Sequence, residues 1–160
     1  MRDSGAMSDL DDAAASVLTA SRALLAVVAR SVAPILDQVT VPQFRVLVLL
    51  SNADGPVRHG DLAAALDVHS TTFTRTIDRM VSGGWVERRP NPDSRRETLI
   101  SATAAGVDLV REVTEARHRE IRAILAALPA RERAAVGAAL AAFAEAAGEQ
   151  PAPVLAEFSL

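Results

Sequence analysis

The hydrophobic repeat of this chain changes from a helical to a strand-like period near residue 85, and no other feature constrains the fold as strongly. The segment HSTTFTRTIDRMVSGGW (69–85) has apolar residues three and four positions apart and ends near two glycines, as amphipathic helices do. The segment WVERRPNPDSRRETLIS (85–101) instead alternates around an Asn-Pro-Asp-Ser turn. The sequence therefore predicts a helix that leads directly into a β-hairpin with a turn of roughly nine residues.

A second, shorter helix is predicted just before this one. VRHGDLAAALDV (57–68) is expected to bury Leu62 and Leu66, and only about three residues separate it from the next helix. Two helices joined by so tight a turn form a helix-turn-helix. One stripe of the second helix is expected to face the core, and it consists of Phe73, Ile77, Met80 and Val81.

Further helices are predicted on both sides of this unit. Apolar residues recur at steps of three and four over 9–36, and a short apolar helix follows over 40–56 with Thr40 as its cap. Thr103 starts a helix of about 26 residues, and 130–147 is the last one. From 102 to 147 the chain has 17 alanines, which favour helix but bury little area.

The predicted fold class is mainly α with a small β-hairpin, arranged as one domain over residues 1–160. Residues 40–101 form a winged helix-turn-helix, and 8–37 with 103–147 form a helical region. Because alanine-rich helices gain most from packing closely against several others, we expect two subunits to share this region; a bundle within one chain is the alternative. Residues 148–160 form a tail, either docked on a partner subunit or disordered.

Positive charge is concentrated in the segment that contains the second helix and the hairpin. Residues 69–96 carry six arginines and three acids, a net charge of +3, whereas the rest of the chain has 11 basic and 17 acidic residues. The whole chain has a net charge of -3 and no lysine, so only the placement of the arginines is informative. A local positive surface on an acidic protein is typical of a site for a polyanion.

Several classes of site are excluded by composition or spacing. The chain has no cysteine, which excludes disulfides and thiolate zinc sites. Its three histidines, His59, His69 and His118, lack metal-ligand spacing, and no nucleophile elbow or phosphate-binding glycine loop is present. We therefore expect no metal, no cofactor and no enzymatic activity.

The chain is also expected to be cytoplasmic. Its uninterrupted apolar runs are far shorter than the roughly 20 residues that cross a bilayer. Its N-terminus, MRDSGAMSDLDD, is more acidic than basic, unlike a secretory signal. No association with a membrane is expected.

The polar face of the second helix is the first candidate for contact with DNA. It holds short hydroxyl side chains, an arginine and an acid, at Ser70, Thr71, Thr74, Arg75 and Asp78. Small hydroxyl groups let a helix lie deep in the major groove, and Arg75 could donate two hydrogen bonds to guanine. An ordinary solvated helix face, with Ser70 or Thr71 as N-cap, is the alternative.

The hairpin is the second candidate. Because successive side chains of a strand point to opposite faces, only one of each adjacent arginine pair can face DNA. We assign Arg95 at the tip to the minor groove, and Arg88 and Arg96 to phosphates. Asp93 is expected to orient Arg95 by a charge-assisted hydrogen bond. A solvated charged hairpin is the alternative.

The central segment resembles a known family. LAAALDVHSTTFTRTIDRMVSGGWVERRPNPDSRRETLISATAAG (62–106) is similar to MarR-type winged helix-turn-helix regulators, in which a recognition helix with Ser/Thr and Arg leads into ERRP and an Asp-x-Arg wing. The order of the outer helices extends the resemblance to residues 10–147. Matched residue by residue, the groove-facing positions are Ser70, Thr71, Thr74 and Arg75, and the wing pair is Asp93 and Arg95.

The resemblance implies a homodimer that binds a pseudo-palindromic double-stranded DNA operator, usually as a repressor. It also implies release by an effector, often a small aromatic acid or phenolic compound, which binds where the helical and winged regions meet. The basic residues that could serve such an anion, each better explained as a surface charge, are Arg22, Arg30, Arg45 and His118. The ligand residues therefore stay unassigned. A winged helix used for protein contact, without specific DNA binding, is the alternative function.

Three positions depart from the family pattern. Asp67 occupies the turn where glycine is frequent, and His69 stands where a capping serine is common. Ala102 replaces a frequent leucine before the helix that starts at Thr103. The first two departures bear on the geometry of the turn between the two helices.

Overall fold

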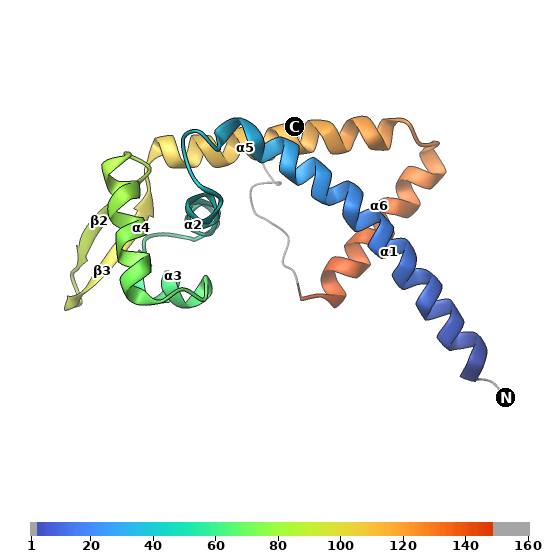
Figure 1. The fold of residues 1–160 in the computed structure, drawn as a ribbon, viewed down its shortest axis with the longest axis horizontal. Coiled ribbons are helices and arrows are strands. Elements are labelled where there is room, and N and C mark those ends of the chain that lie inside the picture. Colours follow the sequence, from blue (N-terminus) through green and yellow to red (C-terminus); the bar gives the residue numbers. More distant parts are fainter. Residues whose placement is uncertain (1–2, 149–160) are drawn as a thin grey trace.

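The computed structural model describes residues 3–148 and, within them, the side chains of residues 8–94 and 97–148. Figure 1 shows the winged unit at one end and long helices at the other, with α5 joining the two. The elements are, in chain order, α1 (Asp3–Val32), the 3-10 helix η1 (Ala33–Ile35), α2 (Val41–Ser51), β1 (Val57–Arg58), α3 (His59–Ala65), α4 (Ser70–Ser82), β2 (Val86–Asn91), β3 (Ser94–Ala102), α5 (Ala104–Ala126) and α6 (Ala130–Ala146). The predicted fold class, mainly α with a small β-hairpin, is confirmed.

Helix starts follow the predicted capping residues. The Thr40 hydroxyl accepts a hydrogen bond from Gln43 N–H at 3.5 Å, and the Gln43 side chain accepts one from Thr40 N–H at 2.8 Å, which is a reciprocal capping box. Thr103 caps α5 by accepting from Gly106 N–H at 3.2 Å.

The first helix was predicted to stay α-helical to residue 36, but Pro34 lacks the required donor and the last turn tightens into η1.

The prediction of a helix over 57–68 is wrong at both ends. Val57 and Arg58 form a short strand, β1, that pairs antiparallel with β3 through Val57↔Ile100 and Arg58↔Leu99. The helix itself, α3, covers only His59–Ala65. The sheet therefore has three strands in the order β1-β3-β2, and β1 ties the start of the helix-turn-helix to the wing.

The hairpin turn is much tighter than the predicted nine residues. Strand β2 continues to Asn91 and β3 begins at Ser94, so only Pro92 and Asp93 form the loop. The register shifts between Pro90 and Asn91, and the Asn91 side chain accepts a hydrogen bond from Asp93 N–H at 3.0 Å. This bond from the backbone to a side chain two residues earlier is an Asx-type turn, which stabilises a sharp reversal of the chain.

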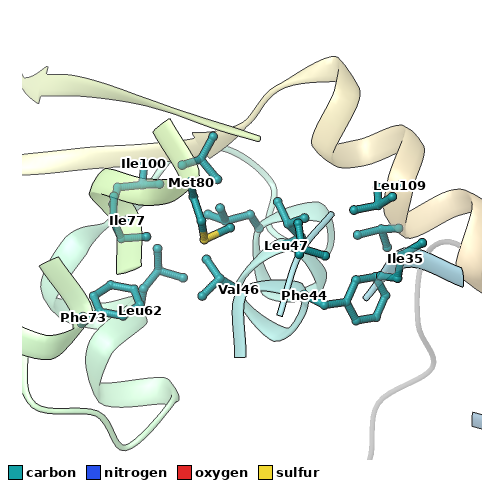
Figure 2. Packing of buried hydrophobic residues seen from close by; sticks show 14 of the residues in the cluster. Ile35, Phe44, Val46, Leu47, Leu62, Phe73, Ile77, Met80, Ile100 and Leu109 are labelled. Atoms are coloured by element: carbon teal, nitrogen blue, oxygen red, sulfur yellow. The ribbon is translucent and has the colours of Figure 1, made fainter. Parts of the chain in front are cut away.

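The core lies where α2, α4, α5 and the sheet meet. Figure 2 shows Phe73, Leu62 and Ile77 at one end of the buried cluster and Phe44, Ile35 and Leu109 at the other. The predicted stripe of α4 is confirmed for its three fully buried members, Phe73, Ile77 and Met80. It is wrong for Val81, which is 40% exposed, because this residue lies 80° from Phe73 around the helix at the edge of the stripe.

The outer helices leave large apolar side chains uncovered. No residue of α6 is buried, so the single chain does not form the closed bundle that was the alternative. The exposed large apolar residues of α1, α5 and α6 are Leu10, Val17, Leu18, Leu24, Leu25, Val28, Val107, Ile124, Leu140 and Phe143. The stretch Ser8–Ile35 is also long and apolar enough to cross a membrane by length and composition. Only uninterrupted apolar runs were considered from the sequence, and these did not identify this stretch. Residues 149–160 of the predicted tail lie outside the described residues.

Candidate nucleic-acid interface

The turn between α3 and α4 is closed by backbone hydrogen bonds and one residue with a left-handed conformation. Asp67 has a φ of 53°, and its N–H and that of Val68 donate to Ala64 and Ala63 carbonyls, each at 3.1 Å. Aspartate tolerates this region better than most residues, which explains how it replaces the glycine frequent in the family. His69 is the N-cap of α4 but makes no side-chain cap bond, so the alternative role of Ser70 or Thr71 as N-cap does not hold.

The outer face of α4 presents the predicted polar side chains together. Ser70, Thr71 and Arg75 are exposed, and Thr74 is half-buried. Thr74 Oγ1 donates to the Ser70 carbonyl at 2.9 Å and lies 3.4 Å from His59 Nε2 of α3. Thr74 is therefore oriented by contacts inside the protein, whereas the other three side chains are accessible to a ligand.

Arg88 of β2 is tied to α4. Its Nη2 lies 2.9 Å from Asp78 Oδ1 in a partly exposed ion pair, so the residue assigned to a phosphate already has an acidic partner. The neighbouring Arg89 pairs with Glu87 at 2.8 Å. A hydrogen bond from Ser101, followed in size by the one from Arg89, lowers the pKa of Glu87. Side chains of β2 thus connect this strand both to α4 and to the other strand of the wing, β3.

The wing tip holds the remaining predicted residues. Asp93 is exposed in the two-residue loop. Arg95 and Arg96 belong to β3, but their side chains lie outside the described residues. Their assignment to the minor groove and to a phosphate, and that of Asp93 to Arg95, stay predictions.

His59 was not among the predicted contact residues. Its ring packs against Phe73 of α4 with centroids 4.9 Å apart and planes at 60°. Burial, followed by the charge of Arg88, lowers the pKa of His59, while Asp78 opposes this effect. A lone histidine at the start of a short helix gives no signal in the sequence, because its neighbours on α4 and β2 come from later segments.

A rigid joint connects the winged unit to α5. Thr103 donates from its N–H to the Trp85 carbonyl at 3.1 Å and from its hydroxyl to the Gly84 carbonyl at 2.6 Å. A Cβ atom on Gly106 would lie 2.4 Å from the Trp85 carbonyl oxygen, so only glycine permits this close approach. These contacts therefore fix the start of the wing against the start of α5.

A cavity of about 390 Å³ lies between α2 and α4, and a second, of about 300 Å³, lies where α1, α2 and α5 meet. The walls of the second are mainly apolar, with Arg45 and Arg117 as the cationic residues. Arg117 donates to Ser31 Oγ at 3.3 Å, and burial lowers its pKa. Among residues 8–94 and 97–148 it has no acidic partner.

Of the four basic residues considered from the sequence, Arg45 lines the cavity and Arg30 is paired with Glu120.

Comparisons with known proteins agree with this geometry. The model of the MarR family matches residues 39–98. Among curated proteins, the multiple antibiotic resistance protein MarR of Escherichia coli is 38% identical over 68 residues, which cover 42% of this chain and 46% of that protein. The chain thus spans about half the length of these curated relatives.

Two solved structures extend the likeness to nearly the whole chain. A MepR variant of S. aureus bound to an oligodeoxyribonucleotide has a TM-score of 0.63 at 17% identity, over 83% of this chain and 96% of that one, which shows a shared fold alone. RV1404 of Mycobacterium tuberculosis has a TM-score of 0.79 at 44% identity, over 87% of this chain and 94% of that one. The helix-turn-helix, its wing and the flanking helices, together with these matches, show that the chain belongs to the MarR family and has its winged helix-turn-helix fold.

Proposed function

We propose that this protein is a sequence-specific DNA-binding transcriptional regulator. The observation that carries the proposal is the exposed polar face of α4 beside an arginine-bearing wing. Ser70, Thr71 and Arg75 are accessible on that face, and residues 69–96 carry a net charge of +3 in a chain of net charge -3. A helix of this kind enters the major groove while an adjacent positive strand follows the phosphates.

The proposed contacts divide into base reading and backbone binding. Arg75 donates to a guanine from the middle of α4, and the hydroxyls of Ser70 and Thr71 bond phosphates or base edges. Arg95 enters the minor groove and Arg96 contacts a phosphate. Arg88 keeps its bond to Asp78, and since a guanidinium has five N–H donors, it can bind a phosphate at the same time.

The protein is proposed to act as a homodimer on a pseudo-palindromic operator. The uncovered apolar side chains of α1 and α6 support this, because a second subunit would remove them from water. A dimer of this type spaces its two recognition helices about one DNA turn, on the order of 34 Å, apart. Repression follows if the operator overlaps a promoter, and a cytoplasmic location follows from access to DNA.

The cavity between α1, α2 and α5 supports a ligand response. Arg117 is half-buried there, bonded to Ser31 and without an acidic partner among the described side chains, and Arg45 is a second cation of the lining. An apolar pocket with two arginines suits a small aromatic or phenolic anion. Because the joint at Thr103 holds the wing to α5, a ligand in this cavity would act by displacing α2 and the helix-turn-helix relative to α1.

Titration with the DNA upstream of the protein's own gene tests the proposed function. Fluorescence anisotropy should show tighter binding to this DNA than to a scrambled duplex of equal length, with an affinity that falls steeply as salt is raised. Arg75→Ala should reduce the preference for the specific DNA. Equal, weak binding of both duplexes at low salt would instead favour the use of the winged helix for protein contact.

A further inference from the structure

His59 lies behind the proposed recognition face, between α3, α4 and β2. Its ring packs on Phe73, and its Nε2 lies 3.4 Å from Thr74 Oγ1. The ring is only partly buried. It therefore contacts the recognition helix and retains access to solvent, or to a ligand of the winged unit.

The hydrogen bonds of Thr74 determine which nitrogen of His59 carries a proton. Thr74 Oγ1 donates its single proton to the Ser70 carbonyl, 2.9 Å away. With that proton engaged, Oγ1 offers Nε2 a lone pair, which favours the tautomer with its hydrogen on Nε2. In the part of the chain that the structure describes, Nδ1 has no hydrogen-bond partner. A second proton would therefore bind at Nδ1.

The charged groups nearest to His59 come from two other elements. Asp78 of α4 favours a positive ring and Arg88 of β2 opposes it, and these two residues are paired with each other. On the remaining adjoining elements, the charged residues whose side chains the structure describes are Asp61 of α3, Arg58 of β1 and Glu97 of β3, the last two forming a pair at 3.4 Å. Burial and Arg88 together lower the pKa of His59, so the ring is neutral in the free protein near pH 7.

We propose that His59 is a positioning residue of the DNA interface that takes up one proton per subunit when the protein binds DNA. A phosphate close to α3 attracts a positive ring, and the proton at Nδ1 supplies a donor for a phosphate oxygen. Nε2 continues to donate to Thr74, so one residue links the DNA backbone to the recognition helix. The proton comes from solvent, and no other bond changes. This proposal rests on the proposed DNA-binding function.

The chain is well suited to a test, because His59, His69 and His118 are its only histidines and it has no cysteine. Anisotropy titrations of the upstream DNA at constant salt are run from about pH 5.5 to about pH 8, the range in which histidine titrates. The affinity should rise as the pH falls, by up to about tenfold per pH unit for each subunit. His59→Gln keeps a donor for Thr74 but cannot take up the proton, so this dependence should disappear. The matched variants His69→Gln and His118→Gln should retain it.

The outcomes separate this proposal from the function on which it rests. Failure of the wild-type protein to bind DNA at every pH and at low salt would overturn both. DNA binding that is independent of pH, or a pH dependence that His59→Gln retains, would overturn the role of His59 alone. An NMR titration of the wild-type His59 ring, free and in the complex, does not depend on the folding of a variant. Its pKa must rise on DNA binding, and an unchanged or lower value would overturn the proposal.

Discussion

The guanidinium of Arg88 on β2 lies 2.9 Å from the carboxylate of Asp78 on α4, so one side-chain pair joins the wing to the recognition helix. The pair is partly exposed, with relative side-chain exposures of 35% and 55%. Exposed pairs contribute only about 0–1 kcal/mol to stability. We therefore expect the pair to act mainly by fixing the relative positions in which α4 and the wing contact DNA.

Replacement of Asp78 by Asn should lower the discrimination between specific and scrambled DNA. The ion pair with Arg88 is reduced to a weaker, uncharged hydrogen bond, and removal of a negative charge near phosphates strengthens non-specific binding. The ratio of the two affinities is measured at one salt concentration. Asp108→Asn removes an exposed acid paired with Arg111 on α5 and serves as the control. An undiminished ratio in Asp78→Asn would show that the pair does not position the wing.

Gly106→Ala should destabilise the protein. The added Cβ would lie 2.4 Å from the Trp85 backbone oxygen, and backbone cannot move aside cheaply, so we expect a loss of about 1–3 kcal/mol in the free energy of unfolding. Thermal or urea denaturation measures it. Gly60→Ala, in α3 with no atom within 4 Å of the new Cβ, should instead gain up to about 1 kcal/mol. Equal stability of the two variants would contradict the rigid joint.

Phe143→Glu should convert the proposed dimer to a monomer. This side chain is 54% exposed in the single chain, and a buried charge in its place would cost more than the contact provides. Light scattering after size-exclusion chromatography gives the mass. Val107→Glu alters another exposed apolar residue, on the first turns of α5 beside the winged unit, and should stay dimeric. A dimeric Phe143→Glu protein would place the interface elsewhere.

Arg117→Met should abolish a ligand response without loss of stability. A half-buried guanidinium without an acidic partner among the described residues is poorly compensated, so an apolar residue of similar length should be neutral or stabilising by on the order of 1 kcal/mol. Benzoate, used as a probe, should raise the melting temperature of the wild-type protein and not that of the variant. The same rise in both would exclude Arg117 from the site.

The stability of the free protein should fall as the pH drops below about 6.5, the ordinary pKa of histidine. The pKa of His59 is lowered in the folded state by burial and Arg88, so the unfolded chain binds this proton more readily. The stabilisation is thus present above the unfolded pKa and is lost as the pH falls from there through the lower folded pKa. Urea denaturation at about pH 7.5 and about pH 5.5 should show this loss in the wild-type protein and a smaller loss in His59→Gln. A loss of the same size in both would assign it to other groups.

Features that depend on a few neighbouring residues could be predicted from the sequence. The caps at Thr40 and Thr103 are side-chain bonds to residues three positions away, and the glycine step after α4 is equally local. The two-residue strand β1 could not be predicted, because its only support is its pairing with Ile100 and Leu99. The short turn at Pro92 and Asp93 was missed because it depends on that same register and on the Asn91 side chain.

The sequence by itself determined the helices, the hairpin, the helix-turn-helix and the concentration of arginines on one segment, since periodicity, capping and charge are properties of short windows. Only the tertiary structure decided which of the described side chains become partners of one another. Pairs such as Arg88 with Asp78, His59 with Thr74 and Arg117 with Ser31 join residues 10, 15 and 86 positions apart. No local pattern encodes such distances, because the chain brings these side chains together only when its buried faces pack.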